Sequence, residues 1–281
     1  MREYIDLHVH TSKSDGFYPL EWILKEAEKI GLSAIAVTDH DTIEALTDIK
    51  NLSIKSKVAV IPGVELTAYN RYGSEIHILG YGIDIYSDEL QQKLKKIQAN
   101  RFCESMQIIH ILSKSNVPLP IDEFVQNGYQ VNGFGVKQLL AQKGYLDDAI
   151  QAFPDLFQPD GKLKVPKRRL STEDAIRLIK NSGGKAYLAH ALSVSKDIAV
   201  IEVLVKQLIS EGLDGIECYN SIFKQNPYPP LCDLAEKYHL HICGGSDFHG
   251  KVKPDVALGR GKGDIRVAYA VLAKMKVAPL I

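Results

Sequence analysis

Short apolar runs alternate with amphipathic stretches through most of the chain. Residues 4–7 have the pattern of a buried strand, and residues 19–30 repeat apolar side chains at helical spacing up to Gly31. A second β-branched run follows at residues 33–37, and the same order of strand and helix returns between residues 171 and 249. Alternation of this kind is typical of an α/β fold with a largely parallel sheet, and polar residues just beyond each strand favour a barrel-like arrangement.

One pair of predicted strands breaks the parallel order. The apolar run that ends at Glu65 is followed by another at residues 75–81, and the segment between them is too short for a helical crossover. We therefore expect a hairpin. In a hairpin, His77 near the start of the second strand lies at the same end of the sheet as Glu65, so we expect the two side chains to meet.

The middle of the chain lacks strand patterns. Residues 88–116 have helical spacing, and shorter helical patches follow, separated by glycine- and proline-marked turns. We expect a helical insertion, or lid domain, at residues 87–170. The barrel domain then consists of residues 1–86 and 171–281.

Composition narrows the class of protein. The apolar fraction is 45% and the charged fraction 24%, as in ordinary globular proteins. Lysine and arginine number 34 together, as do aspartate and glutamate, so the formal net charge is zero. We therefore expect no stable complex with nucleic acid. The four cysteines show no C-x-x-C spacing, and no signal peptide or membrane span is evident, so we expect a cytoplasmic protein with reduced thiols. Nothing in the sequence indicates the oligomeric state.

Imidazoles and carboxylates collect at the predicted strand ends. Six of the nine histidines belong to this set, which consists of His8, His10, Asp15, His40, Glu65, His77, His190, Asp247 and His249. Residues i and i+2 of a strand share a face, so the first two histidines can reach one ion. Nine imidazole and carboxylate ligands without thiolates predict two or three Mn²⁺, Fe²⁺ or Zn²⁺ ions. Glu65 can bridge two of them.

The remaining polar residues have simpler interpretations. His110 is expected on a helix face, and His239 and His241 flank a strand. Glu217 and Asn220 end another strand. They either orient ligands from behind or only close the rim of the barrel.

The motifs HxH with a following aspartate, TDHDT, GVE, IHILGY, LAH and GSDFHG occur in that order. This series resembles the PHP (polymerase and histidinol phosphatase) superfamily, and closely its stand-alone metal-dependent phosphoesterases, such as nucleoside 3′,5′-bisphosphate phosphatases. The resemblance implies a distorted seven-stranded (β/α) barrel of the PHP type with a helical insertion. It also implies hydrolysis of a phosphate ester by a metal-activated water, with a phosphomonoester of a nucleotide or short oligonucleotide as the expected substrate.

The resemblance also divides the ligands among the ions. The first set is His8, His10, Glu65 and Asp247; the second is Glu65, His77 and His190; the third is Asp15, His40 and His249. Asp247, His249 or His190 is expected to pass a proton to the leaving oxygen.

Residues outside the cluster are expected to bind the substrate. A basic run at residues 162–169 re-enters the barrel domain and is either a solvated loop or an anion-binding edge. The expected substrate-binding cations are Arg101, Lys167, Arg168 and Arg169. Where close relatives carry a Gly-Arg-Pro-His-type motif, this chain has Gly133 at the arginine and Gly135 at the histidine. Without the arginine, the binding of a bisphosphate is weaker, so we expect a preference for substrates that carry one phosphate.

Other functions compete with this interpretation. The substrate could be a small metabolite resembling histidinol phosphate, or the same metals could attack the carbonyl of an amide or lactone. A non-catalytic, metal-stabilised binding module is a third alternative. A structural metal site needs only four ligands, so a set of nine candidate ligands argues against a non-catalytic binding module.

Overall fold

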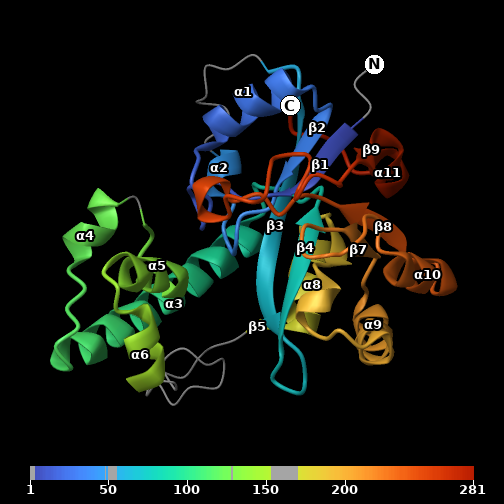
Figure 1. Cartoon of the computed structure of the whole chain (residues 1–281). Helices are drawn as coiled ribbons and strands as arrows, with labels where there is room; N and C mark the ends of the chain where they lie inside the picture. The colour runs from blue at the N-terminus through green and yellow to red at the C-terminus, as the bar shows by residue number, and fades with distance from the viewer. Residues whose placement is uncertain (1–3, 48, 50–55, 128, 153–169) are drawn as a thin grey trace. The chain divides into compact units, whose positions relative to one another are not determined.

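The structure is a computed structural model, drawn in Figure 1, and it describes residues 4–47, 49, 56–127, 129–152 and 170–281. Contacts divide the chain into two compact units. The first comprises Met1–Gln91 and Leu170–Ile281, and the second comprises Gln92–Arg169. The predicted limits of barrel and insertion lie within a few residues of these boundaries.

The first unit is built on one mixed sheet. Its strands are β1 (Tyr4–Val9), β2 (Ala34–Val37), β3 (Ala59–Tyr69), β4 (Glu75–Tyr81), β5 (Leu170–Ser171), β6 (Lys185–Leu188), β7 (Gly215–Tyr219), β8 (His241–Gly244) and β9 (Val267–Ala268). They are ordered β8-β7-β6-β4-β3-β2-β1-β9, and β5 pairs with β3. β4 is antiparallel to both of its neighbours.

The two ends of the sheet approach each other. Val9 at the end of β1 forms a parallel bridge with Phe248, just beyond β8, and His10 N donates to Phe248 O at 3.0 Å. The sheet is therefore a nearly closed barrel. The predicted barrel class is confirmed, with β5 and β9 as two-residue additions to its seven longer strands.

Helices line the outside of this sheet. They are α1 (Leu20–Ile30), α2 (Glu44–Thr47), α8 (Thr172–Asn181), α9 (Ile198–Glu211), α10 (Pro229–Lys237) and α11 (Tyr269–Met275), with short 3-10 turns η2 (Ala191–Ser193) and η3 (Gly250–Val252). Figure 1 shows α8, α9 and α10 following one another beside β4, β7 and β8. α1 ends at Gly31, as predicted, because φ there is +84° and glycine adopts this conformation without strain.

The predicted hairpin of β3 and β4 is confirmed, but the predicted end of β3 is wrong. The strand continues four residues beyond Glu65 to Tyr69, since pairing with β4 continues to Glu75. Glu65 therefore lies within the strand. Thr67 stands opposite His77 in the register, and Glu65 and His77 meet.

The first unit has a further strand and a further helix beyond β8, after the alternation of strand and helix that the sequence predicts up to residue 249. β9 pairs antiparallel with β1, and α11 follows it. Val271, Leu272 and Met275 of α11 join the buried core of the barrel. β9 has only two residues, so its stability depends on β1 rather than on a local pattern.

The core beneath the site combines aliphatic residues with two large phenols. Tyr81 and Tyr187 are fully buried, and their rings meet edge to face with centroids 5.2 Å apart. Tyr81 Oη donates to Leu7 O at 2.8 Å on β1. This bond satisfies a buried hydroxyl and ties β4 to the strand that carries the H-x-H motif.

The second unit contains most of α3 (Asp88–Lys114) and all of α4 (Ile121–Gln126), α5 (Gly133–Gln142) and α6 (Leu146–Ala152). Its buried core includes Leu112, Phe124 and Leu139. None of the described helices has the length and apolar character needed to cross a membrane.

Local geometry differs between Gly133 and Gly135, the two glycines that replace the arginine and histidine of the Gly-Arg-Pro-His-type motif. A Cβ at Gly135 would collide with the carbonyl oxygen of Gln130, so this position requires glycine. A Cβ at Gly133 would meet nothing within 4 Å. The consequence of Gly133 for substrate choice stays a prediction.

Candidate active site

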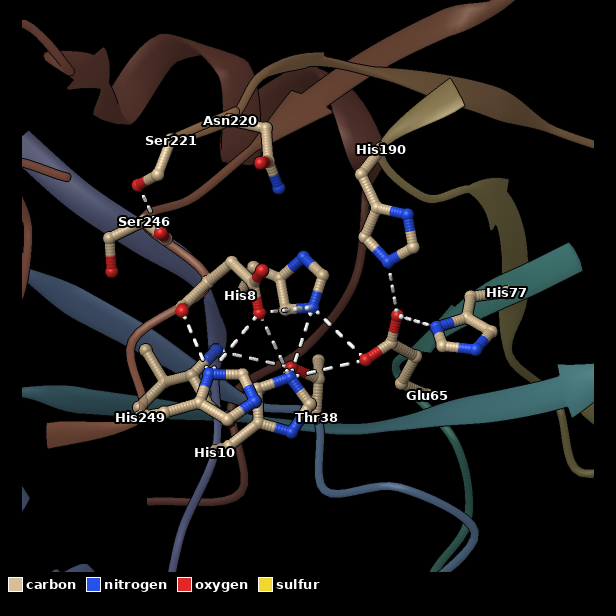
Figure 2. A network of polar contacts seen from close by, with 12 residues as sticks. His8, His10, Thr38, Glu65, His77, His190, Asn220, Ser221, Ser246 and His249 are labelled. Carbon is tan, nitrogen blue, oxygen red and sulfur yellow. Dashed lines mark hydrogen bonds and ion pairs between the residues drawn. The ribbon is translucent and has the colours of Figure 1, made fainter. Parts of the chain in front are cut away.

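Glu65 on β3 lies among imidazoles from several strands, and Figure 2 shows His8, His10, His77 and His190 around it. Oε2 is 3.2 Å from His8 Nε2, 3.1 Å from His10 Nε2 and 3.3 Å from His40 Nδ1, and Oε1 is 2.9 Å from both His77 Nδ1 and His190 Nε2. The carboxylate is fully buried. Its two oxygens thus face two different groups of histidines, which is the arrangement required of a ligand shared between two ions.

The two histidines of β1 share a face, as the alternation of the strand predicts. His8 Nε2 and His10 Nε2 are 3.1 Å apart. Asp247, from the loop after β8, places Oδ1 3.6 Å and 3.4 Å from these atoms. The barrel closure between Val9 and Phe248 brings these distant parts of the sequence together.

Asp15 forms the other side of the cluster. Its Oδ1 is 3.4 Å from His10 Nδ1, and its Oδ2 is 3.7 Å from His40 Nε2 and 3.2 Å from His249 Nε2. The structure therefore brings together all nine residues that the sequence analysis selected. Their assignment as ligands stays a proposal.

Two of these residues have unusual backbone conformations. His190 has φ +25° and Asp247 has φ +58°. Residues other than glycine rarely adopt positive φ values of this kind. His190 N donates to Glu217 Oε2 at 2.6 Å, which helps to hold the strained turn after β6. Strain that surrounding contacts maintain is characteristic of functional sites.

Glu217 orients the cluster from behind. Oε1 lies 2.8 Å from His8 Nδ1, and Oε2 accepts from Asn220 Nδ2 at 3.0 Å as well as from the backbone of His190. A carboxylate on the second ring nitrogen fixes the orientation of an imidazole. Of the two alternatives for Glu217, the structure favours the orienting role over simple closure of the rim.

Two buried carboxylates that were not predicted from the sequence hold the loops bearing the clustered residues. Asp39 accepts from Thr11 N and Thr11 Oγ1, both at 2.7 Å, and from Ser14 Oγ at 2.5 Å. Asp6 accepts from Ser246 N at 2.8 Å and from Ser246 Oγ at 2.5 Å. Burial raises the pKa of both carboxyls, while these hydrogen bonds lower it. Their position next to the histidine motifs was the available signal.

Lys253 was also missed. This lysine follows the GSDFHG motif, and its Nζ donates to Asp247 Oδ2 at 2.8 Å. Its side chain is 40% exposed, so it extends from solvent to the cluster. The ammonium group holds one oxygen of Asp247 while the other oxygen faces the histidines.

Charges within the cluster compensate one another. Burial alone would raise the pKa of Glu65, but His40, His8 and His77 hold it well below its usual range. Burial opposes charge on His77, yet Glu65 raises the pKa of this imidazole to about 10. The buried negative charge therefore demands positive partners.

The cluster fits divalent cations by its donors and by its geometry. The Nδ1 atoms of His10 and His40 are buried, and neither forms a hydrogen bond, although each lies within 3.4 Å of a carboxylate oxygen. Among the residues that the structure describes, three groups offer ligand atoms within 4.8 Å of one another: His10, Asp15, His40 and His249; His8, His10 and Glu65; and His40, Glu65 and His77. Imidazole and carboxylate donors suit Mn²⁺, Fe²⁺ and Zn²⁺.

The substrate-binding cations expected from the sequence stay predictions. Lys167, Arg168 and Arg169 lie outside the described residues. Arg101 lies on α3 in the second unit and stays a prediction. His110 is also on α3, while His239 and His241 precede and begin β8, as expected.

Comparison with known families decides the relationship. The PHP domain family matches residues 6–196, a range that begins on β1 and includes Glu65 and His190. The chain belongs to the PHP domain family. This confirms the resemblance that the histidine motifs indicated.

Three curated relatives of this PHP protein span nearly its whole length. It is 29% identical over 252 residues to phosphoribosyl 1,2-cyclic phosphate 1,2-diphosphodiesterase of Eggerthella lenta, covering 88% of this chain and 94% of the relative. It is 30% identical over 261 residues to 5′-3′ exoribonuclease Rnm of Escherichia coli, covering 91% and 88%. The 3′,5′-nucleoside bisphosphate phosphatase of Chromobacterium violaceum is 26% identical over 249 residues, with 87% of each chain covered.

A solved structure supports the same fold. A Bifidobacterium adolescentis protein proposed to be a metal-dependent phosphoesterase superposes with a TM-score of 0.78 at 24% sequence identity, covering 96% of this chain and 94% of the other. Together with the curated relatives, the family match confirms the predicted class, a phosphoesterase of the PHP family.

Proposed function

We propose that this PHP protein hydrolyses a phosphate ester of a nucleotide or short oligonucleotide, with two or three divalent ions, Mn²⁺, Fe²⁺ or Zn²⁺, held by the nine clustered residues. The position of Glu65 carries the proposal, since its two oxygens face separate groups of imidazoles. A non-catalytic structural site does not require a shared carboxylate with this number of neighbours.

The ligands divide naturally around Glu65. His8, His10 and Asp247 lie on the Oε2 side, and His77 and His190 lie on the Oε1 side. Asp15, His40 and His249 would complete a third site. Divalent ions bound there would lower the pKa of a coordinated water toward about 7 and offset the charge of the phosphate.

The chain supplies the remaining parts of the reaction. Water oxygen forms a bond to phosphorus, the ester P–O bond breaks, and the leaving oxygen takes up a proton. Asp247, His249 and His190 are the proposed proton donors. Lys253 fixes Asp247 through Oδ2, and Ser193 Oγ lies 2.9 Å from His190 Nδ1. These contacts hold the donors in place.

The relatives favour a ribose-containing substrate. Their names specify a phosphoribosyl cyclic phosphate, RNA and a nucleoside bisphosphate. A small metabolite resembling histidinol phosphate is the alternative ester. An amide or lactone would require attack on carbon instead of phosphorus by the same cluster.

A release assay over matched esters tests the proposal. The Mn²⁺-loaded protein is incubated with a nucleoside monophosphate, a 5′-phosphorylated dinucleotide, histidinol phosphate and an acyl lactone. We expect phosphate or nucleotide release from the first two at the highest kcat/KM. Exclusive opening of the lactone would overturn the proposal, and exclusive hydrolysis of histidinol phosphate would select the alternative substrate class.

The third ligand group gives a separate prediction. Asp15→Asn weakens the contacts to His10, His40 and His249, and His40→Ala removes the contacts to Asp15 and Glu65. Neither substitution changes His8, Asp247 or His190. We expect each variant to lose about tenfold or more in kcat because charge stabilisation at phosphorus weakens. About two ions should stay bound, measured by elemental analysis after dialysis. Loss of all ions would show that the ligands do not form separable sets.

Lys253 provides a test outside the ligand set. Lys253→Met keeps the aliphatic stem but removes the charge on Asp247 Oδ2. We expect kcat/KM to fall about tenfold, since a charge-assisted hydrogen bond is worth roughly 1.5–3 kcal/mol and this lysine is partly exposed. Lys253→Arg should recover part of the loss. Lys274→Met on α11 is the control, and equal effects of the two methionine variants would contradict a specific role for Lys253.

A further inference from the structure

Four aromatic residues gather beside the loops that carry Asp15 and Asp247. The rings of Tyr18 and Trp22 stack at 3.6 Å with 10° between their planes, and Phe248 is parallel to both at 6.3 Å and 6.4 Å. Phe17 does not join this stack. Its ring meets Tyr18 edge to face at 5.0 Å, and it is 44% exposed.

Phe17 is held at the edge of the cluster by the backbone. Its N donates to His249 O at 3.0 Å, and its Cβ lies 3.1 Å from the position that a Cβ would occupy on Gly250. Phe17 is two residues beyond Asp15. Its backbone is therefore tied to both loops that deliver this side of the proposed metal centre.

The exposed ring is accessible to a planar cation or base. Lys251 Nζ lies over it, 4.8 Å from the ring centroid. A cation–π contact at an exposed site is weak, and a base that stacks on an aromatic ring gains more. A nucleobase can therefore displace the lysine, whose charge is then free for a phosphate of the same molecule.

We propose that Phe17 is the base-stacking residue of a nucleotide subsite beside the metal cluster, with Lys251 as its mobile cover. The proposal rests on the proposed function and specifies its substrate, since a sugar phosphate has no aromatic base to stack. It predicts that the enzyme distinguishes nucleotides from ribose phosphates through one exposed side chain.

The test compares two esters that differ only in the base. kcat/KM for adenosine 5′-monophosphate and for ribose 5-phosphate is measured in the wild type and in Phe17→Leu, which keeps an apolar side chain but removes the aromatic face. We expect the nucleotide value to fall about tenfold, through KM, with the ribose phosphate value changed less than about twofold. Phe17→Trp should retain the preference.

A matched aromatic–cation pair elsewhere in the first unit serves as the control. Tyr72, in the turn between β3 and β4, is 70% exposed and lies 5.0 Å beneath the guanidinium of Arg71. Tyr72→Leu should change neither value. Equal loss for both esters in Phe17→Leu, or no loss for either, would overturn the subsite.

Binding of adenosine, which has no phosphate, tests the subsite without turnover. Calorimetry on the loaded wild type should show binding that Phe17→Leu weakens about tenfold and Tyr72→Leu does not. If adenosine binds in this way but no ester is hydrolysed, the proposed function fails and the subsite stands. If the esters are hydrolysed but adenosine binding is the same in both variants, the subsite fails alone.

Discussion

Glu65→Gln is expected to abolish phosphoester hydrolysis while leaving the barrel folded. The substitution keeps the size of the side chain but removes the charge that faces five imidazoles. Loss of ligation at two ions removes several kcal/mol of transition-state stabilisation, which corresponds to about 10³-fold or more in kcat. Steady-state kinetics and elemental analysis of the same sample measure the two effects together.

The neighbouring strand offers a matched control. Glu75 on β4 also contacts His77, with its Oε1 3.3 Å from Nε2, but it is exposed at the far side of that imidazole. Glu75→Gln should reduce kcat only a few-fold. Near-normal activity of Glu65→Gln, or equal losses in both variants, would show that Glu65 is not the shared ligand.

Removal of the metals is expected to have the second large effect. Exhaustive chelation should stop hydrolysis and lower Tm, because an ion that binds only the folded state stabilises it by linkage. An ion present at about 100 times its Kd contributes about 2.7 kcal/mol, which corresponds to roughly 5–10 °C for a domain of this size. Differential scanning calorimetry with and without chelator measures the shift.

The chelation experiment has an internal control. Ions returned to the chelated protein should restore Tm and activity together, whereas Glu65→Gln should show a much smaller shift on chelation because it has fewer ions to lose. Full activity after chelation would contradict the metal-dependent account. A lower Tm with unchanged activity would assign the ions a structural role only.

The site could be predicted where local patterns determine it. His8 and His10 alternate on one strand, and strand ends of a parallel sheet meet at one face, so the cluster follows from the sequence. The meeting of Glu65 and His77 followed from a connection too short for a crossover. These inferences required only strand periodicity and loop length.

Other features depend on contacts between distant segments. β3 extends to Tyr69 because β4 supplies its partner, and β9 exists because β1 does. Lys253 reaches Asp247 only because the 3-10 turn η3 redirects the chain after His249. Asp39 is an ordinary acid in the sequence, and only the fold shows that it binds the loop between His10 and Asp15.

The most direct test of the account is a count of ions per chain made on the same protein sample whose phosphate release is measured. Protein dialysed against Mn²⁺ should contain at least two tightly held ions. The rate of nucleoside monophosphate hydrolysis should fall in proportion to the number of ions removed. Hydrolysis that continues at full rate in protein containing no metal would contradict the central claim that the residues around Glu65 form a metal-dependent phosphoesterase centre.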